Sequence, residues 1–63
     1  MIFEIGDVAR LNSGGLDMTV DYAGEKKFTH GGKVEVVVCV WFDGKTLKKE
    51  TFKPEQLEMV KKK

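Results

Sequence analysis

Several residue types that small proteins use for stability or chemistry are nearly missing from this chain of 63 residues. Cys39 is the only cysteine, so an intramolecular disulfide is impossible. One Cys and one His cannot supply the four ligands of a structural zinc site of the Cys/His type. A domain of about 60 residues buries only about 60% of the surface that its unfolded chain exposes. The chain must therefore rely on close packing or on oligomerisation for its stability.

Strong net charge and long apolar runs are also missing. The net charge is +1, so no strong global field attracts nucleic acid or a membrane surface. No apolar run approaches the roughly 18 residues of a transmembrane helix, and the N-terminal segment MIFEIGDV lacks the positive region of a signal peptide. With a single, reduced cysteine, we expect a cytoplasmic protein without a membrane partner.

What the chain does have is seven glycines, which divide it into short segments, and an apolar period of two. In residues 17–22, Met18, Val20 and Tyr22 alternate with polar residues, which is typical of a half-buried antiparallel strand. The same reasoning predicts strands at 7–11, 17–22, 33–42, 45–52 and 58–60, a polar mobile loop at 24–32 and a helical turn at 54–57 that starts with proline.

The tightest turn is expected at Asp43-Gly44, because a type I′ hairpin turn needs positive φ at both central residues. Five short strands with a 3-10 turn before the last one are the plan of an SH3-like barrel. We therefore predict an all-β protein with one SH3-like barrel domain over residues 1–60 and a disordered lysine tail at 61–63.

Several short motifs then resemble the YodC-like family of small bacterial proteins of unknown function. They are Gly6-Asp7-Val8, Leu11-x-Ser13-Gly14-Gly15, Met18-Thr19-Val20, Cys39-x-Trp41-Phe42-Asp43-Gly44, Glu50-Thr51-Phe52 and Leu57-Glu58-Met59-Val60. Together they cover nearly the whole chain apart from residues 24–32 and the lysine tail. The resemblance implies a small β-barrel and no particular activity.

Residues 36–42, VVVCVWF, are apolar on both faces of the predicted strand. The resemblance favours an inward face of Val37, Cys39 and Trp41. Their expected companions in the core are Val8, Met18, Val20, Tyr22, Leu47, Phe52 and Leu57. The opposite face would then carry an exposed apolar stripe, which we define as Val36, Val38, Val40 and Phe42.

The apolar stripe has three alternative interpretations. It is an interface to a second copy or to a protein partner, since large exposed apolar patches are rare on monomers. Alternatively, the N-terminal residues Ile2, Phe3 and Ile5 cover it within the chain. A β-bulge that swaps the two faces midway along the strand is the third reading.

Candidate catalytic chemistry is sparse, and we predict no catalytic residue, no metal site and no cofactor. We expect Cys39 to be a buried, inert thiol, His30 a solvent-exposed loop residue, and Ser13-Gly14-Gly15 a plain turn, because a strand rather than a helix follows it. Asp7 and Asp43 belong to turns, where their side chains bond nearby backbone. Trp41 is expected to be a partly exposed core residue.

A basic patch of Lys33, Lys45, Lys48, Lys49 and Lys53 is predicted around the second hairpin, with Lys33 close across the hairpin. Glu50 and Glu55 interrupt the patch, and interleaved aromatic residues for base stacking are lacking. Nucleic-acid binding is therefore the second hypothesis, behind a non-catalytic module that self-associates or binds a protein partner through the apolar stripe.

An enzyme is the third hypothesis. The chain is loosely similar to the type II dihydrofolate reductases, whose SH3-like subunits build one pore as a tetramer. The segment that matches their Val-Gln-Ile-Tyr pore segment is Lys49-Glu50-Thr51-Phe52 here, so the expected folate and NADPH contacts are missing. We accordingly predict that the protein is not an enzyme.

Overall fold

Five antiparallel strands form one sheet in the computed structural model, which describes residues 3–27 and 31–63. The elements are β1 (Val8–Leu11), β2 (Met18–Lys27), β3 (Lys33–Asp43), β4 (Thr46–Phe52), the 3-10 turn η1 (Pro54–Gln56) and β5 (Leu57–Lys61). The described residues contain no other helical segment. The predicted all-β class, the five strands and the short turn before the last strand are confirmed.

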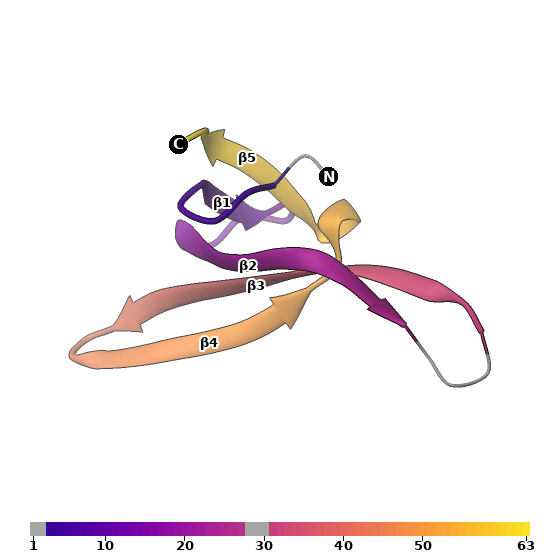
Figure 1. Cartoon of the computed structure of the whole chain (residues 1–63). Coiled ribbons are helices and arrows are strands. Elements are labelled where there is room, and N and C mark those ends of the chain that lie inside the picture. Colours follow the sequence, from indigo (N-terminus) through magenta and orange to yellow (C-terminus); the bar gives the residue numbers. More distant parts are fainter. Residues whose placement is uncertain (1–2, 28–30) are drawn as a thin grey trace.

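The strand order is β4-β3-β2-β1-β5. Strand β2 joins the two parts of the sheet, because its first residues pair with β1 while most of its length pairs with β3. Figure 1 shows β1 and β5 lying over the long strands β2, β3 and β4, with the β3–β4 turn and the far ends of β2 and β3 projecting in opposite directions. The core lies beneath β1 and β5, and the ends of the hairpins extend past it.

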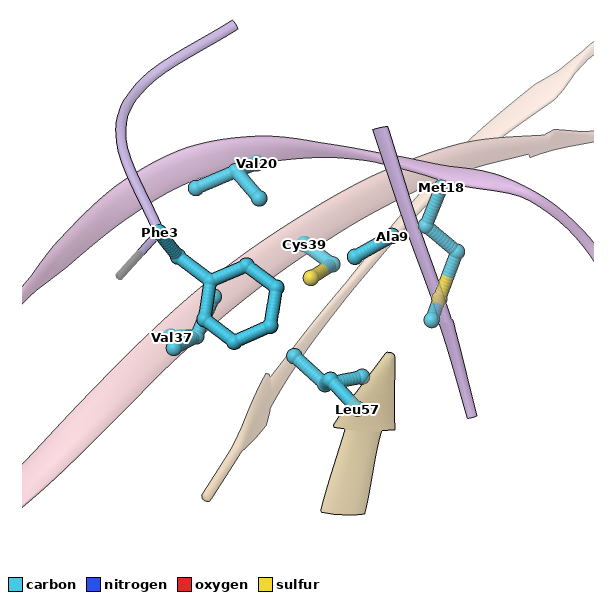
Figure 2. Packing of buried hydrophobic residues seen from close by; sticks show 7 residues of the cluster. All are labelled: Phe3, Ala9, Met18, Val20, Val37, Cys39 and Leu57. Atoms are coloured by element: carbon cyan, nitrogen blue, oxygen red, sulfur yellow. The ribbon is translucent and has the colours of Figure 1, made fainter. Parts of the chain in front are cut away.

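The core combines residues from the segment before β1 and from β1, β2, β3 and β5. Its buried members are Phe3, Ala9, Met18, Val20, Val37, Cys39 and Leu57, and Figure 2 shows how they face one another. Val37 and Cys39 are completely buried, which confirms the predicted inward face of β3. Trp41 and Phe52 pack against this cluster and are half-buried.

Three residues expected in the core lie elsewhere. Val8 is half-buried, because its neighbour Ala9 takes the core position on β1. Leu47 is 57% exposed, since β4 runs past the end of the core. Tyr22 is 48% exposed. The pairing shifts between Val20 and Tyr22, so β2 has one extra residue there, a β-bulge at Asp21 that turns Tyr22 to the opposite face.

Two local predictions are also corrected. Residues 24–27 belong to β2 rather than to a loop, because they pair with residues 33–36 of β3. The turn between β3 and β4 has Gly44 and Lys45 at its centre, and only Gly44 has a positive φ, of 65°. It therefore has the pattern of a type II′ turn, with glycine first, and not of the expected type I′ turn.

The lysine tail was expected to be disordered. In the structure Lys61 is the last residue of β5, and the next two residues reach the buried carboxylate of Asp7. The backbone N–H of Lys63 donates to Oδ1 of Asp7 at 2.9 Å, and Nζ of Lys62 donates to Oδ2 at 3.1 Å. These hydrogen bonds hold the C-terminal residues against the N-terminal turn.

Candidate interaction surface

The apolar stripe lies on the solvent side of β3. Cross-strand pairing puts Val38 beside Tyr22 of β2 on one side and Thr51 of β4 on the other. The three valines of the stripe are half-buried by such neighbours, whereas Phe42 is 69% exposed. The strand alternation therefore separates a buried set, Val37 and Cys39, from the stripe on the opposite face.

The bulge at Asp21 enlarges the apolar surface. Because it turns Tyr22 outward, the tyrosine ring lies next to the stripe, where it covers Gly24 on the same strand. A Cβ added at Gly24 would lie 2.5 Å from Oη of Tyr22, so only glycine leaves the ring its present place. The alternating pattern of β2 gave no sign of this contact.

Strand β4 adds a second apolar residue that sequence reasoning missed. Leu47 lies directly opposite Phe42 and next to the turn, and both side chains are exposed. Beyond them, Lys49 pairs with Val40 and reaches Asp21 of β2, with its Nζ 3.5 Å from the carboxylate. The stripe is thus widened by Tyr22 and Leu47 and bordered by polar side chains.

The N-terminal segment does not cover the stripe in the part of the chain that the structure describes. Phe3 is buried on the core side of the sheet, near Val37 and Val20 in Figure 2, and Ile5 is 59% exposed. Ile2 lies outside the described residues. The third alternative, a swap of faces within β3, does not occur either, since the bulge is in β2 and the β3–β4 register is unbroken.

The five lysines of the predicted basic patch do not form one surface. Lys48 and Lys49 point to opposite faces of β4, because Lys48 pairs with Trp41 and Lys49 with Val40. Lys45 lies in the β3–β4 turn. Lys33 was expected close to these residues but begins β3 at its other end, where it shares a pocket with Lys53 and lies 4.0 Å from Glu25.

Asp7 and Cys39 have shifted pKa values because of contacts and burial that belong to the folded structure. Hydrogen bonds, the backbone N–H of Lys63 first among them, hold the pKa of Asp7 below its ordinary value of 3.8 although burial opposes this shift. The backbone N–H of Glu4 also donates to Asp7 at 2.9 Å, which is the local turn contact predicted for this residue. Burial raises the pKa of the Cys39 thiol, which favours the unreactive protonated form.

The remaining candidates bring no reactive cluster together. Gly14 and Gly15 have positive φ and lie in the connection between β1 and β2, and His30 lies outside the described residues. Within residues 3–27 and 31–63, no three Asp, Glu, His or Cys residues gather as a metal site would require. None of the helical residues in this part of the chain forms a segment long and apolar enough to cross a membrane.

A comparison with models of known protein families assigns the chain to one of them. The family model described as an uncharacterized small protein family, DUF2158, matches residues 4–57. The chain belongs to the DUF2158 family. Neither the curated proteins nor the solved structures gave a match. The DUF2158 description carries no activity, so the function has to be argued from the surface just described.

Proposed function

We propose that this DUF2158 protein is a small, non-catalytic interaction module that self-associates or binds a protein partner through the apolar stripe. The observation that carries the proposal is that the stripe, with three half-buried valines and the exposed Phe42, lies on the solvent side of a strand whose other face is already buried. An apolar patch with a polar border on a soluble protein often marks an interaction site. The strand order and the 3-10 turn before β5 support an SH3-like, YodC-like barrel, and we further propose a bacterial cytoplasmic setting.

The dimensions of the stripe set the expected strength of association. Six residue steps separate Val36 from Phe42, or about 20 Å at about 3.3 Å per residue. Three neighbouring strands about 4.8 Å apart add a width of about 10 Å between the outer strand axes. An area on the order of 200–300 Å² is well below the roughly 800 Å² that each partner contributes to a standard interface. We expect association through the stripe alone to be weak and concentration-dependent.

Molar mass by light scattering over a concentration series tests the proposal. The test variant is Val38→Lys/Val40→Glu, and the matched control is Leu16→Lys/Val60→Glu, which changes exposed apolar residues away from the stripe. We expect the wild type and the control to rise toward the dimer mass and the test variant to remain a folded monomer. A monomeric wild type whose test variant unfolds would make the stripe part of the core and overturn the proposal.

A monomeric wild type with a folded test variant would direct attention to a different protein. Immobilised wild type and the test variant would then be compared for the capture of partners from bacterial extract. A partner retained by the wild type and the Leu16→Lys/Val60→Glu control, but lost by the test variant, would support the partner-binding form of the proposal.

Nucleic-acid binding is the weaker alternative, because the lysines are divided between two faces and two ends of the β3–β4 hairpin. Binding of nucleic acid through lysines would fall steeply as salt is raised, whereas association through the stripe would change little. A salt series on any detected complex separates the two functions.

A further inference from the structure

The first four residues of β3 have a strand neighbour on one side only. Residues 33–36 pair with residues 24–27 of β2. On the other side β4 pairs with β3 only from Val37 onward, opposite Phe52, and the chain then leaves the sheet to form η1. We call the space beside residues 33–36, in line with β4, the open lane. No described residue pairs with β3 in this lane.

The turn between β3 and β4 determines which backbone groups face the open lane. In a hairpin with a two-residue turn, the flanking residues, here Asp43 and Thr46, form a hydrogen-bonded pair. The register between the two strands is unbroken, so every second residue of β3 counted back from Asp43 directs its N–H and C=O toward the β4 side. In the open lane these residues are Glu35 and Lys33.

Four backbone groups, one N–H and one C=O from each of these two residues, therefore point into the open lane. No hydrogen bond to the backbone of the described η1 residues or the loops satisfies them. Beside them lies a pocket of about 350 Å³. It is lined by Lys33, Val34, Glu35, Lys53, Pro54 and Glu55. The volume lies within the range of about 300–1,000 Å³ that is usual for ligand sites.

The spacing of these groups defines the ligand. Alternating backbone donors and acceptors on a strand edge are matched by another extended polypeptide, which adds to the sheet as a strand. We propose that the open lane binds an extended segment of a partner protein as an additional strand antiparallel to β3. This binding site is an edge of the sheet and not the face that carries the apolar stripe, so it goes beyond the function proposed above.

Charge complementarity predicts the sequence of the bound segment. In antiparallel pairing, the residue opposite Glu35 comes first in the ligand and the residue opposite Lys33 comes two positions later. Opposite charges stabilise such cross-strand pairs and like charges destabilise them. The central ligand residue lies beside Val34, where a β-branched apolar side chain packs well. The bound segment should therefore contain a basic residue, a β-branched residue and an acidic residue, in this order from its N-terminus.

Two peptides of the same composition test this reading. Acetyl-Thr-Lys-Val-Glu-Thr-amide puts each charge opposite its complement, and acetyl-Thr-Glu-Val-Lys-Thr-amide puts like charges opposite each other. Titration into ¹⁵N-labelled protein should shift the amide signals of Lys33 and Glu35 with the first peptide, with a Kd on the order of 0.1–1 mM. The second peptide should bind at least about fivefold more weakly.

Backbone recognition is tested by N-methylation of the first peptide. Methylation at Glu removes an N–H that faces β3 and should weaken binding about tenfold, the loss expected for one backbone hydrogen bond. Methylation at Val is the matched control, because that N–H points away from β3, and it should change the affinity much less. Equal losses for the two methylated peptides would mean that the N–H of Glu does not face β3 in the way predicted, and they would overturn the proposal.

A charge exchange in the protein provides the decisive variant. Lys33 and Glu35 are both exposed, so Lys33→Glu/Glu35→Lys should fold normally and reverse the preference between the two peptides. The proposal is wrong if the wild type shows no shift at millimolar peptide, if it does not prefer the first peptide, or if the shifts fall on Val38, Val40 and Phe42 and not on Lys33 and Glu35. Shifts of the Lys33 and Glu35 amides with protein concentration alone would place a second copy in the lane and equally overturn the partner-peptide assignment.

Discussion

Replacing Val37 by alanine should destabilise the protein far more than the same change at its neighbour Val38. Val37 is completely buried between β2 and β4, whereas Val38 is half-buried on the solvent side. Removal of two buried methyl groups costs about 0.8 kcal/mol for each group, and the cavity left behind adds to the loss. We expect about 2–3 kcal/mol for Val37→Ala and less than about 1 kcal/mol for Val38→Ala.

These losses are easy to measure in a small domain. A chain of this length has a total stability of about 3–9 kcal/mol, so Val37→Ala removes about a fifth or more of it. At about 4–8 °C for each kcal/mol, Tm should fall by about 8–24 °C. Urea unfolding followed by the fluorescence of Trp41, the only tryptophan, gives the free energy of unfolding for the wild type and both variants.

The comparison has a clear negative result. Equal losses at the two positions, or a larger loss for Val38→Ala, would mean that β3 presents its other face to the core. The apolar stripe would then be buried, and both the fold assignment and the interaction surface would fail together. A change of the urea m-value in one variant would also require a separate account of its unfolded state.

Three further predictions concern single side chains. Hydrogen bonds hold the pKa of Asp7 below its ordinary value of 3.8 in the folded protein. The contribution of Asp7 to stability is therefore complete above about pH 3.8 and is lost as the pH falls below this value toward the folded pKa. Urea titrations at several pH values should show that the free energy of unfolding of Asp7→Asn depends less on acid pH than that of the wild type. Gly44→Ala should lose about 1–2 kcal/mol, because φ is 65° there; an unchanged thermal midpoint would refute the turn assignment. Native Cys39 should react with a thiol reagent only as fast as the protein opens, since the thiol is buried and its pKa is raised. Rapid labelling under native conditions would contradict this.

The sequence was sufficient for the features that depend on local pattern. The period of two predicted the strands, and the resemblance to the YodC-like family selected the face with Val37, Cys39 and Trp41 as the inward face of β3. The sequence could not show that Ala9 and not Val8 lies in the core, because alanine and valine are equally compatible with a buried position on a short strand. The hydrogen bonds from Lys62 and Lys63 to Asp7 join residues at opposite ends of the chain, and no sequence pattern signals them.

The candidate surface was predicted only in part, because its outline depends on pairing between strands. The bulge at Asp21 reverses the direction of Tyr22, and a simple alternation of apolar residues cannot show this. Gly24 was the available sign, since a glycine inside a strand often marks a bulge or a close approach. The open lane arises because β4 has 7 residues and β3 has 11, so the register decides where the unpaired edge lies.

The most direct test of the interaction surface is a dilution series of ¹⁵N-labelled protein followed by its amide spectrum. The account predicts concentration-dependent shifts at Val36, Val38, Val40 and Phe42, with smaller ones at Tyr22 and Leu47, and a spectrum of Val38→Lys/Val40→Glu that does not change on dilution. Self-association that shifts other surfaces and leaves these residues unaffected would contradict it.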